Sequence, residues 1–392
     1  MDALRRVVVA GHICLDIIPD LSAIPAGQFD RLFQPGHLIE VGAATLSAGG
    51  AVSNTGLALH RLGIPTRLIG KVGDDPIGHE VLHIIGAQGA DLVNAMVVDP
   101  QATTSYSIIL SPPGADRTFL HCAGANHTFS AADVTDDHLG QADLLHFGYP
   151  PVMRRMYADG GRELIELMCR AKALGVTTSL DLCYPDPSSD AGQADWITIF
   201  QAALPCVDIF LPSIEELLFM LRRATFDRLA ANGGVLEQVT PELLMSVADE
   251  LVSMGVKVIV IKLGERGAYL RTASAATLQH LGRARPVNLS AWASQEMWAP
   301  CFKVNVAGTT GSGDATIAGF LSALLRDESP QMAMTMAVAV GACNVEAADA
   351  LSGIRSWEET LARITQGWQR LPLRVDAPGW KWDTQFNLWQ AT

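Results

Sequence analysis

The sequence lacks an excess of basic residues. Its 392 residues include 28 lysines and arginines against 41 aspartates and glutamates, so the formal net charge is −13. Proteins that bind nucleic acids need a basic surface to meet the phosphates, and this balance argues against a nucleic-acid partner. It also argues against the basic amphipathic helix with which some proteins lie on a membrane surface.

Cysteine is sparse and irregularly placed. The chain has seven cysteines, and none of them is spaced as Cys-x-x-Cys. Disulfide frameworks and zinc sites usually show short, repeated cysteine spacings. We therefore expect buried free thiols in a reducing compartment.

Long hydrophobic runs are also missing. The longest apolar stretches are Ala315–Leu325 and Ala333–Val345, shorter than the ~18–20 residues that a membrane span needs. Residues 1–18 have the arginines and the apolar run of a signal peptide, but His12 and Asp16 interrupt the run and no small-residue cleavage site follows closely. We expect a soluble, cytoplasmic protein with no membrane partner.

Hydrophobic residues are plentiful, at 49% against 18% charged residues, so the chain can bury a sizeable core. Short Val/Ile-rich runs alternate with longer Ala/Leu-rich ones, which predicts a mainly parallel α/β sheet with helices on both faces. The predicted strands are Val7–Ala10, Thr66–Gly70, Leu144–Phe147, Thr177–Asp181, Ile209–Leu211, Val258–Lys262 and Ala268–Arg271. The predicted helices are Ser53–Leu62, Pro76–Gln88, Val152–Leu174, Ser213–Leu221, Thr240–Met254, Asp314–Leu325 and Gln331–Asp349.

Two segments interrupt the alternation, at about residues 17–48 and 97–124. They combine Pro/Gly-rich stretches with β-like runs, which indicates a small sheet projecting from the main domain as a lid. We treat residues 1–392 as a single catalytic domain, with 357–392 as a C-terminal extension that packs on the body or on a partner. This extension carries five of the eight tryptophans.

The strongest chemical motif is the small-residue run from Gly308 to Asp314, directly before a predicted helix. Unpaired backbone N–H groups at a helix start attract an anion. A carboxylate beside them is placed to take a proton from a hydroxyl that attacks a phosphoryl group. The alternative interpretation is that Asp314 only caps the helix.

Two further motifs indicate a polyhydroxylated ligand. Gly49 and Gly50 precede a helix whose first turn carries Asn54, and a glycine pair allows close backbone approach. Asp16 follows the first strand, where open α/β sheets hold their ligands, and a carboxylate suits a diol. A structural Gly-Gly turn and a strand-end turn residue are the alternatives.

The order and separation of these three motifs resemble the PfkB (ribokinase-like) family of carbohydrate and nucleoside kinases over residues 5–355. The resemblance also rests on the segments 70–75, 124–126 and 262–267. It implies a three-layer α/β/α fold with a β lid. It also implies transfer of the ATP γ-phosphoryl group, with Mg²⁺, to a hydroxyl of a sugar or related polyol.

The resemblance assigns a role to each matching residue. Asp314 would be the general base, and the backbone of Gly311, Ser312 and Gly313 would form the anion hole. The remaining assignments are Asp16, Gly49, Gly50, Asn54 and Asn126 for the sugar, Lys262, Gly264 and Asn344 for the nucleotide, and Glu216 for Mg²⁺. Lids of such kinases pair between subunits, so a homodimer through the lid is expected.

Three positions depart from the family pattern. Gly308 replaces an Asp linked to monovalent-cation binding, Ser213 replaces the Asn of an Asn-x-x-Glu motif, and Lys262 replaces a Thr. Asp181 follows a strand at a position where the family carries a polar residue near the crevice; it is either part of the site or structural. Segments 222–239 and 279–300 match no family motif.

Two alternatives to a sugar kinase stay open. Phe29, Phe33 and Phe119 in the lid segments favour a nucleoside kinase if they stack on a base. Gly308 and Ser213 favour a catalytically silent sensor of sugar or nucleotide. A substrate with a phosphate or carboxylate group would need a cation near the crevice, and the candidates are Arg31, Lys71, Arg117, Arg154 and Arg155.

Overall fold

The computed structural model describes residues 4–24, 35–111 and 118–391. Its centre is a ten-stranded sheet in which six neighbouring strands run parallel and the four at one edge are antiparallel. In sheet order the strands are β15 (Trp380–Asp383), β16 (Leu388–Ala391), β14 (Glu296–Ala299), β13 (Ala268–Thr272), β12 (Val258–Lys262), β11 (Ile209–Phe210), β10 (Thr177–Leu180), β9 (Leu144–Gly148), β1 (Val7–Gly11) and β4 (Thr66–Ile69). This confirms the predicted mainly parallel sheet.

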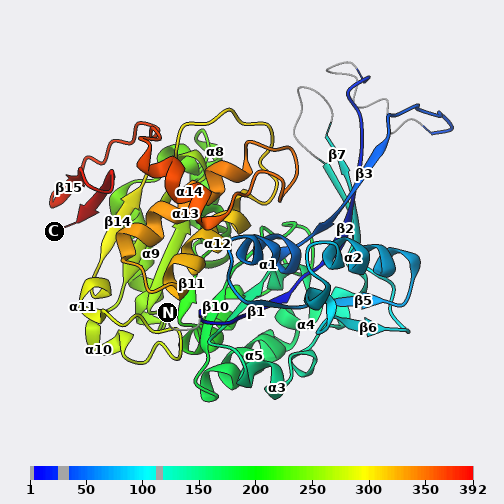
Figure 1. Ribbon diagram of the computed structural model, residues 1–392, viewed down its shortest axis with the longest axis horizontal. Helices are drawn as coiled ribbons and strands as arrows, with labels where there is room; N and C mark the ends of the chain where they lie inside the picture. Colours follow the sequence, from blue (N-terminus) through cyan, green and yellow to red (C-terminus); the bar gives the residue numbers. More distant parts are fainter. Residues whose placement is uncertain (1–3, 25–34, 112–117, 392) are drawn as a thin grey trace.

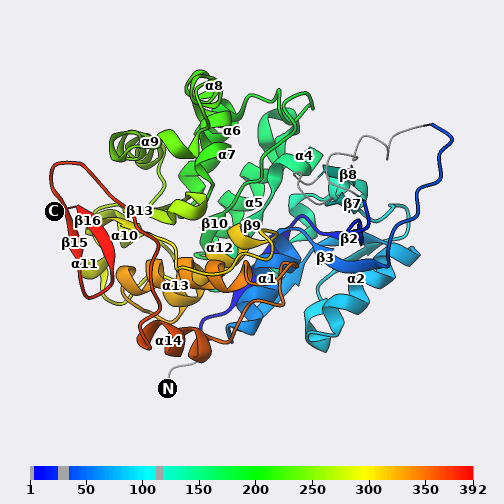
Figure 2. The ribbon, with the colours of Figure 1, turned by 90° about the horizontal axis from the view of Figure 1, so that it is seen from above.

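Helices cover both faces of this sheet (Figure 2). Successive strand residues point to opposite faces, so Val7 and Val9 lie in one hydrophobic cluster while Val8 and Ala10 lie in the other. One layer contains α1 (Ala51–Arg61), α2 (Pro76–Gly86), α12 (Ser312–Leu325), α13 (Pro330–Asn344) and α14 (Trp357–Thr365). The other contains α5 (Arg162–Ala173), α6 (Trp196–Ala203), α7 (Ile214–Leu221), α8 (Arg223–Ala231) and α9 (Pro241–Ser253). The short helices are α3 (Asp136–Gly140), α4 (Arg154–Tyr157), α10 (Ala275–Leu278) and α11 (Leu289–Trp292).

A separate four-stranded sheet projects from the body (Figure 1). Its order is β3 (Ala44–Gly49), β2 (Cys14–Pro19), β7 (Tyr106–Leu110) and β8 (Thr118–Cys122). We call these four strands the lid sheet. Part of the predicted lid lies elsewhere, because β6 (Val97–Asp99) pairs with β5 (Lys71–Gly73) in a sheet of its own.

One predicted helix is wrong. The segment Val152–Leu174 contains α4 and α5, separated by a break at Asp159, Gly160 and Gly161. These three residues have φ values of 51°, 68° and 79°, and a right-handed helix cannot continue through such left-handed backbone. The prediction that all cysteines are free is also wrong, because Cys169 and Cys206 form a disulfide. Linear spacing could not show that α5 brings these two residues together.

The C-terminal extension completes the large sheet. After α14 the chain returns as β15 and β16, and β16 pairs with β14 in an antiparallel arrangement. Trp382 and Trp389 face each other across this hairpin with ring centroids 5.6 Å apart. No helix in the three described ranges is both long and apolar enough to span a bilayer.

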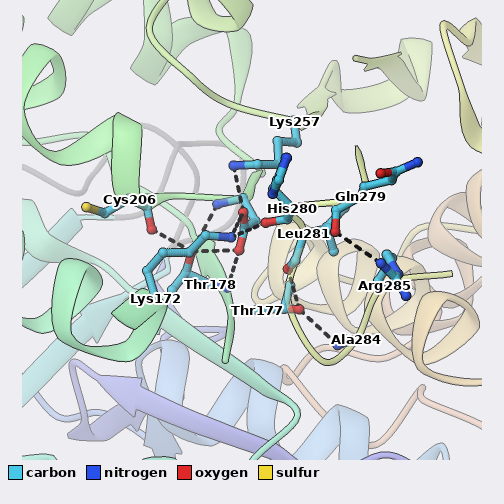
Figure 3. A network of polar contacts seen from close by, with 11 residues as sticks. Lys172, Thr177, Thr178, Cys206, Lys257, Gln279, His280, Leu281, Ala284 and Arg285 are labelled. Carbon is cyan, nitrogen blue, oxygen red and sulfur yellow. Dashed lines mark hydrogen bonds and ion pairs between the residues drawn. The ribbon is translucent and has the colours of Figure 1, made fainter. Parts of the chain in front are cut away.

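At the amino ends of the parallel strands lies a buried ionic network. Asp208 is fully buried, and its Oδ1 lies 2.5 Å from Lys172 Nζ and 2.8 Å from Lys257 Nζ. Its Oδ2 accepts a hydrogen bond from the Thr178 backbone N–H at 3.1 Å. Figure 3 shows the side chains of Lys172, Thr178 and Lys257 converging from neighbouring elements. The network ties β10, β11 and β12 together.

Candidate active site

A cavity of about 480 Å³ opens at the carboxyl ends of the parallel strands. Its lining includes the amino end of α12 and charged groups at the carboxyl ends of β10 and β12. Part of the floor is apolar and comes from α13. The polar and glycine residues that line the cavity include Tyr149, Asp181, Glu216, Lys262, Gly264, Gly311, Ser312, Gly313 and Asp314.

The glycine-rich motif shapes the start of α12. Gly311 is the residue before the helix and has a φ of 73°, which favours glycine. This turn aims the first N–H groups of the helix at the cavity, as an anion site requires. Asp314 lies in the first turn and is 2% exposed.

The Asp314 carboxylate is held by three hydrogen bonds. Tyr149 Oη donates to Oδ2 at 2.7 Å, Asn54 Nδ2 donates to Oδ2 at 3.1 Å, and Thr55 Oγ1 donates to Oδ1 at 3.0 Å. Burial raises the pKa of Asp314, although these hydrogen bonds and the nearby Lys262 act in the opposite direction. Asn54, which we expected at the sugar, therefore contacts the candidate base itself.

Sequence reasoning missed Tyr149, because no motif marks it. It follows β9 with a φ of 67°, a left-handed backbone that is uncommon for a bulky residue. Burial and the neighbouring Asp314 raise the pKa of Tyr149, so its phenol stays protonated and acts as a donor. The only sequence signal available was its position at the carboxyl end of a predicted strand.

Lys262 and Asp181 form an ion pair inside the cavity. Lys262 ends β12, Asp181 follows β10, and Nζ lies 2.5 Å from Asp181 Oδ1. Burial disfavours the lysine cation, but the carboxylates of Asp181, Glu216 and Asp314 outweigh that effect and raise the pKa of Lys262. Lys262 also lies along the first turn of α12, since a Cβ on Gly313 would be 3.7 Å from its Nζ. The ammonium group therefore stands beside the candidate anion hole.

The second oxygen of Asp181 has no hydrogen-bond partner within the described chain. Asp181 is 1% exposed. A buried carboxylate oxygen left unpaired is costly unless a ligand or water reaches it. Asp181 thus has an acceptor available to a ligand in the cavity, unlike the carboxylate of a fully bonded structural ion pair.

Ser213 and Glu216 form a capping box at the start of α7. Glu216 Oε2 accepts from the Ser213 N–H at 2.7 Å, and Ser213 Oγ accepts from the Glu216 N–H at 3.2 Å. Serine thus serves the helix start as an asparagine would, and the Glu216 side chain lines the cavity. At Gly308, by contrast, a Cβ would lie 2.9 Å from the Ala348 carbonyl oxygen, so an aspartate does not fit there without a backbone shift.

The glycine pair packs tightly against Asp16 on β2 and against His12 in the connection between β1 and β2. A Cβ on Gly49 would lie 2.2 Å from Asp16 Oδ2, and one on Gly50 would lie 2.5 Å from His12 Nδ1. Asp16 lies on β2 of the lid sheet, and burial raises its pKa to about 6. The glycines are therefore required by close packing around Asp16 and His12.

Two of the expected binding residues, Asn126 and Asn344, are engaged in other ways, whereas a third, Gly264, lines the cavity. Asn126 is buried, and its amide bonds both the N–H and the carbonyl of Ile13. Asn344 is buried outside the residues that line the cavity, and it donates to the Ala350 carbonyl at 2.6 Å. Gly264 lines the cavity with a φ of 53°.

Comparison with known proteins gives the family. The profile of the pfkB family carbohydrate kinases matches residues 4–357. The chain is 26% identical to the 2-dehydro-3-deoxygluconokinase of Bacillus subtilis (strain 168) over 348 residues, covering 86% of this chain and 94% of that protein.

Solved structures show the same fold. The fructokinase from Xylella fastidiosa with bound ATP superimposes with a TM-score of 0.69 at 19% identity, covering 93% and 99% of the two chains. A putative ribokinase II from E. coli in complex with ATP and Mg²⁺ gives 0.65 at 20% identity, covering 93% and 100%.

The family match over residues 4–357 identifies a phosphotransferase that acts on a sugar hydroxyl, and the ribokinase-like fold agrees with it. The chain belongs to the pfkB family of carbohydrate kinases. This confirms the resemblance found in the sequence.

Proposed function

We propose that this sugar kinase transfers the γ-phosphoryl group of ATP to an acceptor hydroxyl, with Asp314 as the general base. The observation that carries the proposal is the buried Asp314 carboxylate, which three donors orient beside the glycine-rich start of α12. A fixed carboxylate can accept the hydroxyl proton as the oxygen attacks. The adjacent N–H groups of Gly311, Ser312 and Gly313 favour the charge that builds on the transferred group.

The cavity fits a nucleotide. The helix start and the Lys262 ammonium group suit the phosphates, and the apolar surface from α13 suits the base. We assign the phosphates to Lys262 and to the backbone near Gly264. When bound, Mg²⁺ would neutralise phosphate charge. Glu216 is its candidate protein contact, because the described residues hold no cluster of three ligating side chains and Mg²⁺ keeps few protein ligands at such sites.

The acceptor lies, on this proposal, between Asp314 and the lid sheet. Asp16 would bind two hydroxyls of the sugar beside Gly49 and Gly50. Asn54 would orient the base, and Asn126 would shape the site by fixing Ile13.

The decisive test is Asp314→Asn, measured as ADP release with ATP and Mg²⁺ over a panel of sugars, sugar acids and nucleosides. We expect kcat to fall by at least about 10³-fold, in the range for loss of a general base, while ATP binding is retained. Asp91→Asn, at an exposed position away from the cavity, is the matched control. Turnover in Asp314→Asn equal to the wild type would refute the base assignment.

The same panel decides between the alternatives. A sensor would bind nucleotide without transferring phosphate to any acceptor, and a nucleoside kinase would turn over nucleosides alone. Phe29 and Phe33, two of the three aromatics behind the nucleoside alternative, lie outside the described residues. Phe119 is 53% exposed on β8.

We also propose a homodimer through the lid sheet. Its outer strands β3 and β8 carry the exposed apolar side chains Leu46, Phe119 and Leu120, and exposed strand edges of this kind favour pairing with another chain. Light scattering after size exclusion tests this, with Leu120→Glu expected to yield monomers.

A further inference from the structure

His12 is a buried side chain that the proposed mechanism does not use. It is 4% exposed, and neither ring nitrogen has a hydrogen-bond partner among the described residues. Leaving two buried polar atoms unpaired is unfavourable unless a ligand satisfies them.

The position of His12 links the lid sheet to the candidate base. Its ring centroid lies 5.4 Å from that of His121 on β8 and 6.1 Å from that of Tyr149, and Tyr149 donates to Asp314. The three rings therefore lie in a row from the lid sheet to the candidate base, in the region that the proposed function assigns to the acceptor.

The lid sheet adds a row of polar side chains next to this path. Asp16 is in register with Ser107, and Ser107 is in register with His121, so the three residues occupy one face of β2, β7 and β8. Ser107 Oγ lies 3.0 Å from His121 Nδ1. His121 thus stands two strands away from the carboxylate assigned to the sugar hydroxyls.

Basic groups continue beyond His121. Both His121 and His127 retain solvent access, and α4, which begins at Arg154, packs against the turn that carries His127. Burial and repulsion from His121 and His127 lower the pKa of His12 to about 3, and Arg154 contributes to lowering the pKa of His127. With lowered pKa values the three imidazoles are uncharged near neutral pH and offer N–H donors, while Arg154 supplies a positive charge. N–H donors beside a guanidinium group suit an anion.

The other basic residues expected near the crevice do not compete for this role. Lys71 lies 3.5 Å from both Asp99 and Asp133 and is neutralised by them. Arg155 lines a different hollow together with Asp159 and Glu163. Arg31 and Arg117 lie outside the described residues.

We propose that His12, His121, His127 and Arg154 form an anion subsite of the acceptor site, and that the sugar substrate therefore carries a carboxylate or a phosphate ester. The proposal rests on the proposed function, because it takes the acceptor to lie between Asp16 and Asp314. The proposal specifies an anionic sugar, whereas hydroxyl binding by Asp16 would suit any sugar.

The first test measures the binding of sugars in the absence of nucleotide by calorimetry. The probes are matched in carbon skeleton: a neutral hexose, the corresponding hexonic acid and the hexose phosphate. We expect at least one anionic probe to bind at least about tenfold more tightly than the neutral sugar, as a charged hydrogen bond predicts. The better of the two anionic probes identifies carboxylate or phosphate. Equal or tighter binding of the neutral sugar overturns the subsite.

Variants then locate the effect. Arg154→Met and His12→Gln should each weaken binding of the anionic probe at least about tenfold while leaving the neutral sugar within about threefold. Arg155→Met, the exposed neighbour of Arg154, is the control and should change neither. Arg154 is exposed, so its variant is informative even if His12→Gln does not fold. If Arg154→Met weakens both sugars equally, or neither, the proposal fails.

Turnover separates this proposal from the proposed function. An anionic sugar that binds in an Arg154-dependent way but receives no phosphate supports the subsite and contradicts the kinase assignment of this acceptor site. Phosphorylation of neutral sugars alone supports the kinase and contradicts the subsite. Selective phosphorylation of anionic sugars supports both.

Discussion

Two buried aspartate–lysine pairs stand at opposite ends of the same strands. At the amino ends, both oxygens of Asp208 are bonded, by Lys172 and Lys257 on one side and by the Thr178 backbone on the other. At the carboxyl ends, Asp181 bonds Lys262 through one oxygen, and the other oxygen has no partner in the described chain.

The difference shows how the same residue types serve two purposes. A buried carboxylate that is fully satisfied holds elements together, and removing a partner is costly. A buried pair that keeps one acceptor and one ammonium group facing a cavity is incomplete, and incompleteness at the carboxyl end of a parallel sheet points to a ligand. Lys257 directly precedes β12 and Lys262 is its last residue, so each lysine is the natural control for the other.

The largest effect is expected for Lys262→Met. Loss of the ammonium group beside the α12 amino end should lower kcat by about 10²-fold or more, the range for removing a group that stabilises developing charge. The KM for the sugar should stay within about threefold, because the proposed function assigns Lys262 to the nucleotide phosphates. Steady-state kinetics on folded protein measure both. A variant with wild-type kcat would show that the two lysines are equivalent structural cations.

Lys257→Met should affect stability instead. Asp208 would lose one of its two lysine partners while remaining fully buried, and the free energy of unfolding should fall by about 3 kcal/mol. Urea denaturation followed by tryptophan fluorescence measures this, and kcat per folded molecule should match the wild type. A large loss of kcat without a loss of stability would contradict the structural role of Lys257 at the amino ends of the strands.

The double variant Asp181→Asn/Lys262→Met sharpens the contrast. Lys262→Met alone leaves the Asp181 carboxyl buried without its cation, whereas the double variant removes both charges. We expect the double variant to regain stability to within about 1 kcal/mol of the wild type, since a buried pair replaced as a unit is often neutral. Activity should not return. Recovery of activity together with stability would mean that Lys262 acts only through the fold.

The smallest effect concerns pH. Burial raises the pKa of Asp314, and the Tyr149 hydrogen bond opposes that rise. A general base must be deprotonated, so kcat should fall as pH drops through this raised pKa. Tyr149→Phe removes one opposing interaction and should move this acidic limb to higher pH. Lys257→Met should leave the limb in place, and a pH–rate profile of the three proteins compares them.

The sequence alone predicted the part of this molecule that depends on local pattern. The sequence itself shows the apolar runs of β1 and β12 and the glycine-rich start of α12. Strand burial and helix initiation depend on neighbours in the chain, so these features could be predicted. The sheet order of β15 and β16 was not predictable, since pairing with β14 depends on contacts about ninety residues apart.

In the candidate site, too, residues marked by a local motif were predicted and residues that depend on distant contacts were not. Asp314, Gly311 and Glu216 carry motif positions and line one cavity. Tyr149 and His12 were missed because each contacts a partner far away in sequence, Asp314 in one case and His121 in the other. The contact between Asn54 and Asp314 joins two motifs that could be recognised separately but not placed together.

The hydrogen bond from Tyr149 to Asp314 also bears on how such a site treats water. On the proposed mechanism, a bare carboxylate next to a bound nucleotide would activate any hydroxyl that reached it, including that of a water molecule. The phenol already occupies one lone pair of Oδ2, and Asn54 shares the same oxygen. A hydroxyl that approaches Oδ2 must compete with both donors, whereas Oδ1 accepts only from Thr55 and keeps one position open. The three donors would in this way limit the carboxylate to one incoming hydroxyl, for which a sugar held at several points competes better than a water molecule.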